Sequence, residues 1–187
     1  MPIRPIVLCD DPLLRKKSRH VRRVTPALRE LVDDMVETMH ASDGIGLAAV
    51  QVGVPERVIV VQLPGDEEHP EGSKLYAVVN PELARKSRET EDGVEGCLSV
   101  PGLIGEVSRH RTVTIKGLDP RGRAIRIKAE GLLARVFQHE IDHCDGVLFI
   151  DRIKDPEKIW SVPEGEEEII EASQKAPGGV AASGLLV

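Results

Sequence analysis

The spacing of apolar residues predicts a helix near the start of the chain. Thr25 followed by Pro26 is typical of a helix cap and a first helical position. Downstream, apolar residues recur every three or four positions, as they do on one face of a helix: Leu28, Leu31, Val32, Met35 and Met39. Asp43 and Gly44 are expected to end this helix.

Four further segments have the pattern of β-strands. Arg57 to Leu63 and Lys74 to Val79 are predicted strands, separated by a charged loop that contains proline and glycine. Thr112 to Leu118 and Arg123 to Ala129 alternate between apolar and polar residues, and Asp119-Pro120-Arg121-Gly122 joins them as a hairpin turn.

A second helix is predicted directly after the hairpin. Counting from Leu132 at about 100° per residue, Val136, His139 and His143 fall within roughly 40° of it. Leu133, Phe137 and Ile141 widen the apolar side, and Gly146 is a plausible stop. The polar residues on the remaining arc are expected to face water: Arg135, Gln138 and Asp142.

These elements predict an α+β fold, with mixed or antiparallel strands packed around a central helix that carries the two histidines, and another helix near the N-terminus. Residues 1–160 are expected to form a single catalytic domain. From 161 to 187 the chain becomes acidic and then rich in glycine and alanine, and we expect a partly disordered tail there.

Composition fits one compact domain of a reducing compartment. The 187 residues are 41% hydrophobic, and the three cysteines are odd in number and show no disulfide spacing. The first nine residues lack the apolar run of a signal peptide, and no run of 18 apolar residues occurs. A cytoplasmic protein without a membrane span is therefore expected. The net charge of −6 argues against general nucleic-acid binding, and no specific DNA partner is expected.

The stretch Gln138-His139-Glu140-Ile141-Asp142-His143 is the strongest chemical signal in the chain. On a helix, His139 and His143 point the same way and can hold one metal ion, while Glu140 can reach a water bound to that ion. The alternative is a core helix whose histidines are satisfied by hydrogen bonds. Two imidazoles in one buried stripe favour the metal, because both would otherwise lose their hydration without replacement.

A catalytic site of this kind needs a third protein ligand, which must come from elsewhere in the chain. Acids such as Asp155 and Glu157 follow the motif, but no histidine lies beyond Asp151. Upstream, Cys97 lies between two glycines, and its thiolate would be a strong soft ligand. The alternative for Cys97 is a small buried apolar residue.

Three segments together resemble the peptide deformylase family. They are Gly44-Ile45-Gly46-Leu47-Ala48-Ala49-Val50-Gln51, Glu95-Gly96-Cys97-Leu98-Ser99 and the segment from Gln138 to His143. The resemblance extends from about Ile3 to Arg152. It implies an iron-dependent hydrolase that removes the formyl group from the N-terminal formylmethionine of nascent polypeptides and releases formate.

The resemblance also implies the roles of individual residues. Cys97, His139 and His143 would bind one Fe²⁺ ion per chain, which Ni²⁺, Co²⁺ or Zn²⁺ can replace, and Glu140 would act as acid and base. Gln51 and the backbone N–H of Leu98 would stabilise the oxyanion. The substrate groove and methionine pocket would be formed by Ile45, Gly46, Leu132 and Val136.

The residue types suit this hydrolysis on chemical grounds as well. A metal with one thiolate and two imidazole ligands makes hydroxide available near neutral pH, and a carboxylate can carry the proton to the departing amine. Gly44-Ile45-Gly46 lacks the third glycine of a phosphate-binding fingerprint, since Ala49 occupies that position. An extended stretch beside which a peptide backbone lies is the better interpretation.

Two other functions are considered. An HExxH zinc peptidase would use the same helix, and an inactive relative would only bind peptides or ribosomes. A transient ribosome contact is also a hypothesis: a basic run at 15–23 is present, whereas the acidic tail departs from family members that end in a basic helix.

Cys144 is expected to be a buried residue that packs in the core and not a fourth metal ligand.

Overall fold

The computed structural model describes residues 2–65 and 74–162, and both predicted helices are present in it. Helix α1 spans Pro26–Ala41, and the hydroxyl of its N-cap Thr25 accepts a hydrogen bond from the backbone N–H of Leu28. The five apolar residues predicted for its inner face are all buried. Helix α2 spans Gly131–Cys144. The predicted tail lies almost wholly outside the described residues.

In the described residues, eight strands form two sheets in which every pair is antiparallel. The larger sheet has the order β1-β2-β3-β6-β7 and the smaller one β4-β5-β8. The strands are β1 Gly46–Ala48, β2 Val58–Val61, β3 Tyr76–Lys86, β4 Thr90–Gly96, β5 Leu103–His110, β6 Thr112–Leu118, β7 Ala124–Glu130 and β8 Ile159–Ser161. The predicted α+β class is confirmed.

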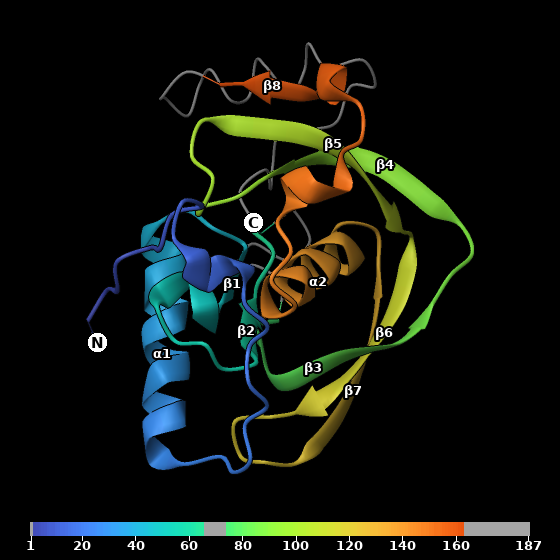
Figure 1. Cartoon of the computed structure of the whole chain (residues 1–187). Helices are drawn as coiled ribbons and strands as arrows, with labels where there is room; N and C mark the ends of the chain where they lie inside the picture. Colours follow the sequence, from blue (N-terminus) through green and yellow to red (C-terminus); the bar gives the residue numbers. More distant parts are fainter. Residues whose placement is uncertain (1, 66–73, 163–187) are drawn as a thin grey trace.

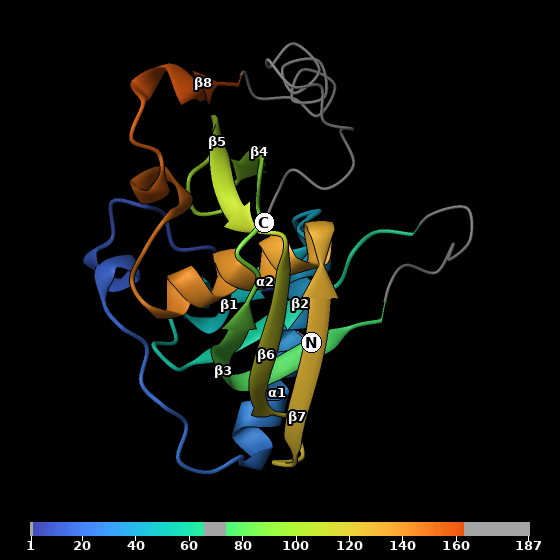
Figure 2. The ribbon, with the colours of Figure 1, turned by 90° about the vertical axis from the view of Figure 1, so that its right-hand side faces the viewer.

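Helix α2 lies at the centre of the molecule (Figure 1), with the larger sheet curving along one side of it and the smaller sheet on the other. The side chains of β2 show how the core is divided. Ile59 and Val61 belong to the apolar cluster around α2, whereas Val58 and Val60 belong to the cluster around α1. The larger sheet is therefore buried on both faces here, and the second view shows α1 and α2 on its opposite sides (Figure 2).

The hairpin of β6 and β7 is as predicted, and its turn is closed by a 2.8 Å hydrogen bond from the Gly122 N–H to the Asp119 carbonyl. The predicted end of the preceding strand was wrong, because β3 continues beyond Val79 to Lys86. Pro81 is tolerated within it because the register with β6 shifts between Val79 and Glu82, so no ladder bond requires its missing N–H.

The prediction that one side of α2 faces water was wrong. Arg135, Gln138 and Asp142 have exposed fractions of only 8%, 4% and 6%. The smaller sheet, which the sequence analysis did not anticipate, covers this side and supplies partners for all three polar groups. A period in hydrophobicity locates a helix, but it cannot show whether a charged stripe is solvated or paired.

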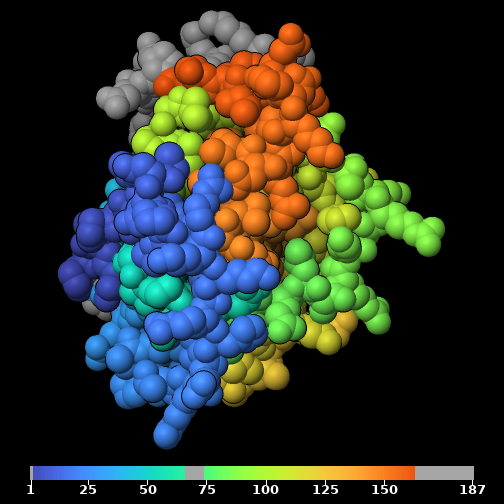
Figure 3. Space-filling model, in the orientation of Figure 1, coloured from blue at the N-terminus to red at the C-terminus, as the bar shows by residue number. Residues whose placement is uncertain are grey.

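The N-terminal segment closes the front of the molecule, where it lies against the chain that follows α2 (Figure 3). Arg15 forms an ion pair with Asp151 across this contact, and Ser18 donates its backbone N–H to the carbonyl of Cys144 at 2.8 Å. Among residues 2–65 and 74–162, no helix has the length and apolarity needed to cross a membrane.

Candidate metal centre

The fold brings Cys97 together with both histidines of α2. Cys97 directly follows β4, and its Sγ lies 3.3 Å from Nε2 of His143. One donor atom from each of Cys97, His139 and His143 lies within 4.8 Å of the other two, and all three residues are buried. The sequence predicts these same three residues as metal ligands, although Cys97 lies 42 positions before His139 in the chain.

The donor atoms fit a metal ion in both chemistry and spacing. Thiolate and imidazole ligands lie about 2.3 and 2.0–2.1 Å from zinc, which puts tetrahedral neighbours about 3.5 Å apart. Nε2 of His139 and both carboxylate oxygens of Glu140 are buried without a hydrogen-bond partner among the described protein atoms. Buried polar atoms are otherwise nearly always paired, so this group of unpaired atoms indicates a bound cation and its attendant water.

A carboxylate behind His139 fixes the orientation of its ring. Oε2 of Glu95 lies 2.9 Å from Nδ1 of His139, so Nδ1 carries the proton and Nε2 presents its lone pair to the cluster. Arg109 holds Glu95 in turn with two hydrogen bonds of 2.8 Å. Burial by itself would raise the pKa of Glu95, but the bonds from Arg109 and His139 outweigh it and hold that pKa well below its usual range.

Arg109 also reaches α2, where its Nη1 lies 2.6 Å from Oδ2 of Asp142. Asp142 is held from the other side by Arg152, whose Nε is 3.0 Å from the same oxygen. Glu95, Arg109 and Asp142 thus form a continuous buried network from β4 and β5 to α2, and the exposed Arg152 pairs with its outer end. Buried ions are tolerated only when they are paired in this way.

Burial in the site disfavours the charged forms of Glu140, Cys97 and His143. Burial, and then the charge of Glu95, raises the pKa of Glu140 well above its usual value. Burial also raises the pKa of the Cys97 thiol and lowers that of His143, with the charge of His139 adding to the second effect. A cation at the cluster would reverse the effect on Cys97, because metal-bound thiols are deprotonated.

Gln51 approaches the cluster from the 3-10 turn Ala49–Val52. Its Oε1 accepts the backbone N–H of Ala48 at 2.8 Å, and its Nε2 lies 3.2 Å from Oγ of Ser99 and 3.7 Å from Sγ of Cys97. The amide is therefore oriented with its donor side toward Cys97. The side chain of Leu98 is only partly buried and packs toward α1.

The residues expected to form the substrate groove lie in two groups. Gly46 in β1 is packed so closely that a Cβ there would be 2.5 Å from Oε1 of Glu140 and 2.9 Å from Cγ1 of Val136. Ile45 is buried beside it, whereas Leu132, one turn before Val136, is 36% exposed. Gly46 and Val136 are therefore adjacent to the candidate centre.

Three residues of the site received no role from the sequence. Glu95 and Ser99 belong to the family-like segment from Glu95 to Ser99. Their place in the sequence does not show which side chains they contact. Arg109 carried a detectable signal, because it shares the buried face of β5 with Gly105 and Val107. A charged residue at such a position needs a buried partner.

Comparison with known proteins agrees with this geometry. The sequence model of the family Polypeptide deformylase matches residues 3–159. The peptide deformylase of Thermomicrobium roseum is 48% identical over 175 residues, covering 92% of this chain and 98% of the relative. That of Halothermothrix orenii is 49% identical over 154 residues, covering 82% and 95%.

Solved structures show the same likeness. The crystal structure of peptide deformylase from Ehrlichia chaffeensis matches with a TM-score of 0.76 and 42% identity, covering 82% of this chain and 89% of that one. The Thermotoga maritima enzyme matches with a TM-score of 0.76 and 39% identity, covering 83% and 100%. Family model, relatives and structures agree over the segments that carry Cys97, His139 and His143, and this chain belongs to the polypeptide deformylase family.

Proposed function

We propose that Cys97, His139 and His143 bind one ferrous ion per chain and that Glu140 and Gln51 use this centre to hydrolyse the formyl amide of N-formylmethionyl peptides. The convergence of one thiol and two imidazoles beside an unpaired, buried carboxylate is the observation that carries the proposal. Water adds to the formyl carbon, the C–N bond breaks, and formate and a free amine are released. The thiolate and imidazole donors suit Fe²⁺ as well as Ni²⁺, Co²⁺ or Zn²⁺.

When bound, the ion supplies a Lewis acid and lowers the pKa of water so that hydroxide is available near neutral pH. Glu140 takes the proton of the attacking water and gives it to the departing nitrogen, which leaves poorly as an anion. Its position supports this role, because both of its oxygens are buried beside His139 without another partner.

Stabilisation of the developing oxyanion is assigned to Gln51 and to the backbone N–H of Leu98. The Ala48 N–H anchors the carbonyl oxygen of the Gln51 amide, so the NH₂ group is already turned toward the centre. Donors that are fixed before the reaction need no reorganisation when charge develops. Leu98 acts through its main chain, so its side chain is free to pack elsewhere.

The peptide substrate is placed along β1, with Ile45, Leu132 and Val136 around its methionine side chain. β1 is an edge strand of the larger sheet, and an extended peptide can pair with such an edge. Gly46 allows a backbone to approach Glu140, since no side chain intervenes. A related deformylase from Acinetobacter baumannii, 34% identical, has been solved with Met-Ala-Ser bound.

Formate release from a formyl-Met peptide after anaerobic loading with Fe²⁺ tests this function. Activity that disappears together with bound metal in Cys97→Ser supports it. The HExxH zinc peptidase alternative expects cleavage of unformylated peptides instead, and the comparisons do not favour it. No formate release from a protein loaded with one ion would indicate the inactive, peptide-binding relative.

A transient contact with the ribosome is also proposed, through the basic run at 15–23. Its exposed basic residues are Arg15, Lys16, Lys17, Arg19, Arg22 and Arg23. Within the part of the chain that the structure describes, Arg15 is the only one of them with an ion pair. Such a surface suits the phosphates of ribosomal RNA.

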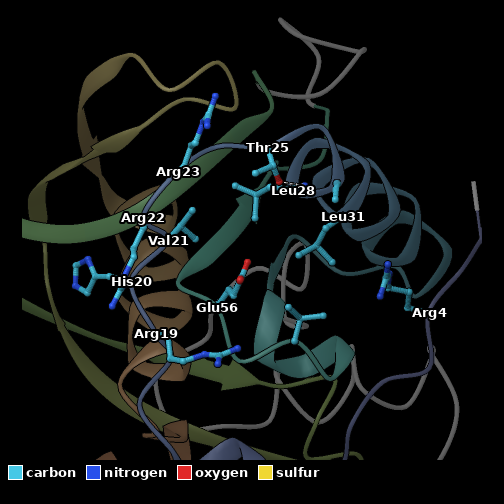
Figure 4. Close-up of a pocket in the computed structure, with 12 residues that line it drawn as sticks. Arg4, Arg19, His20, Val21, Arg22, Arg23, Thr25, Leu28, Leu31 and Glu56 are labelled. Carbon is cyan, nitrogen blue, oxygen red and sulfur yellow. Dashed lines mark hydrogen bonds between the residues drawn. The ribbon is translucent and has the colours of Figure 1, made fainter.

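Part of this run borders a groove of about 1020 Å³ beside the start of α1, whose apolar side is formed by Val21, Leu28, Leu31 and Val54 (Figure 4). The backbone of the run is fixed there: Asn80 binds both the N–H and the carbonyl of Val21 at 2.8 and 2.9 Å, and Arg19 donates to Pro55 at 2.9 Å. The backbone that carries these arginines is thus fixed, so only their side chains need to be ordered on binding.

Replacement of Arg19, Arg22 and Arg23 by Gln tests this contact. We expect weaker binding to a 20-nucleotide RNA and to purified ribosomes, with a salt slope reduced by about 2 for three lost phosphate contacts. The matched control removes three exposed charges from the hairpin, at Arg121, Arg126 and Lys128. Equal losses in both variants, or none, would contradict the contact. Such a role, like the reduced cysteines, would place the enzyme in the cytoplasm.

A further inference from the structure

Arg135 connects α2 to β4 and β5, which frame the loop carrying Cys97. Its Nη1 donates to Oε1 of Glu95 at 2.9 Å and to the carbonyls of Val107 and Gly93 at 2.8 and 3.2 Å. Its Nη2 donates to the carbonyl of Glu91 at 2.7 Å. One guanidinium group, 8% exposed, therefore holds three backbone carbonyls and one carboxylate.

The chain is shaped to receive this side chain. A Cβ at Gly93 would lie 2.8 Å from Nη2 and 2.9 Å from Cζ of Arg135, so only glycine leaves room for it. Arg135 precedes His139 by one helical turn, and both side chains point to the same carboxylate. Glu95 is thus held by Arg135 and Arg109 while it binds Nδ1 of His139.

We propose that Arg135 is a positioning residue, which fixes the placement of β4 on α2 and thereby the geometry in which Cys97 meets His139 and His143. The inference rests on the proposed metal centre. Glu95 and Cys97 belong to one short segment, two residues apart. The guanidinium group of Arg135 binds Glu91, Gly93 and Glu95 along β4. These contacts fix the end of the strand and therefore the position of the Cys97 thiol.

Lysine at this position keeps the positive charge, but its single nitrogen cannot reproduce the contacts that Nη1 and Nη2 make from two separate positions. In Arg135→Lys we expect Co²⁺ to dissociate about tenfold faster than from the wild-type protein, the magnitude typical of lost outer-shell partners. The thiolate-to-cobalt absorption band should shift or weaken, because the sulfur no longer approaches the ion in the same geometry. Neither measurement depends on turnover.

Arg57→Lys is the matched control. Arg57 is also 8% exposed and binds two carbonyls, of Pro81 and Cys144, and one carboxylate, that of Asp145, but it does not contact Glu95. We expect this variant to lose stability while keeping the wild-type cobalt spectrum and dissociation rate. Equal changes in both variants, or a wild-type spectrum and rate in Arg135→Lys, would overturn the proposal.

Gly93→Ala provides a second variant should Arg135→Lys fail to fold, because it keeps every charge and only displaces the guanidinium. The same acceleration of cobalt loss is expected, and a wild-type dissociation rate would refute the role of Arg135. Gly53→Ala is its control: a Cβ there meets no atom within 4 Å, so this variant adds only the backbone strain of a positive φ and leaves Arg135 in place. A wild-type protein that binds no cobalt would refute the metal centre itself, a failure distinct from that of Arg135.

Discussion

At the scale of single residues, Glu140 is the group whose environment is most specialised. It is fully buried, neither of its oxygens has a protein partner, and its pKa is raised by burial and by Glu95. In Glu140→Gln we expect one ion per chain to remain bound and kcat to fall about 10²–10⁴-fold, because the proton transfer is lost. Metal analysis with a formate assay checks this; a kcat within tenfold of wild type would contradict the assigned role.

Gln51 and Leu98 should respond differently to substitution. Loss of one oxyanion donor in Gln51→Ala should lower kcat about 10²–10³-fold. Leu98→Met leaves the backbone N–H in place, so its kcat should stay within about tenfold. Steady-state kinetics on a formyl-Met peptide distinguish the two, and equal losses would show that Leu98 acts through its side chain.

The three cysteines should differ in reactivity. Cys9 is exposed, whereas Cys97 and Cys144 are buried, and burial raises the pKa of Cys144 to about 12. We expect one thiol to react with a disulfide reagent in the folded, metal-loaded protein and three after denaturation. Rapid reaction of Cys97 in the folded protein would mean that the centre is open to solvent.

The three residues that converge at the candidate metal centre could be predicted from sequence, but most of the residues that support them could not. His139 and His143 follow from helical spacing, and Cys97 from its chemistry and from the resemblance. Arg135 and Asp142 were predicted to face solvent because polar side chains are usually exposed. In the structure both side chains are buried and have hydrogen-bond partners. Only the structure shows that Arg109 and Glu95 supply those partners.

At the scale of secondary-structure elements, β1 must lie directly on α2. Gly46→Ala would place a methyl group 2.5 Å from Oε1 of Glu140, so the carboxylate or the strand must move. We expect kcat to fall at least tenfold with the ion retained, whereas Gly53→Ala should cost only the strain of its positive φ of +80°, about 1–2 kcal/mol. Comparison of kcat and of thermal unfolding separates the effects; an unchanged kcat in Gly46→Ala would contradict the packing.

The helices and strands that could be predicted are those in which apolar residues recur at regular intervals. Both helices and the β6–β7 hairpin have regular patterns and were predicted, with boundaries close to those observed. β4 has three acids and two glycines among its seven residues, so its sequence does not resemble a strand. Pairing with β5 and the grip of Arg135 hold it in place, and these tertiary contacts leave no local pattern.

At the scale of the whole molecule, the proposed ion would join two parts of the fold that are distant in sequence, the Cys97 loop and α2. Its removal should therefore lower the free energy of unfolding, by about 4 kcal/mol where the free ion is a thousandfold above its Kd. For a chain of this size the melting temperature should fall on the order of 10 °C. Calorimetry with and without chelator measures the difference, and Cys97→Ser should show no such shift.

The charge of the chain is unevenly distributed along its sequence. Nine of its 31 acidic residues lie in the two stretches 66–73 and 163–187, against a single lysine there. The described residues thus carry slightly more basic than acidic groups, although the complete chain is acidic. The net charge of −6 therefore predicts little about the surface around Arg19, Arg22 and Arg23.

We propose that one sulfur and two ring nitrogens of this chain surround a single ion. X-ray absorption at the metal edge of the zinc-loaded protein reports these ligands and their distances. We expect one sulfur ligand at about 2.3 Å and nitrogen ligands at about 2.0–2.1 Å, with the sulfur contribution absent in Cys97→Ser. A wild-type spectrum with only nitrogen and oxygen ligands would contradict it.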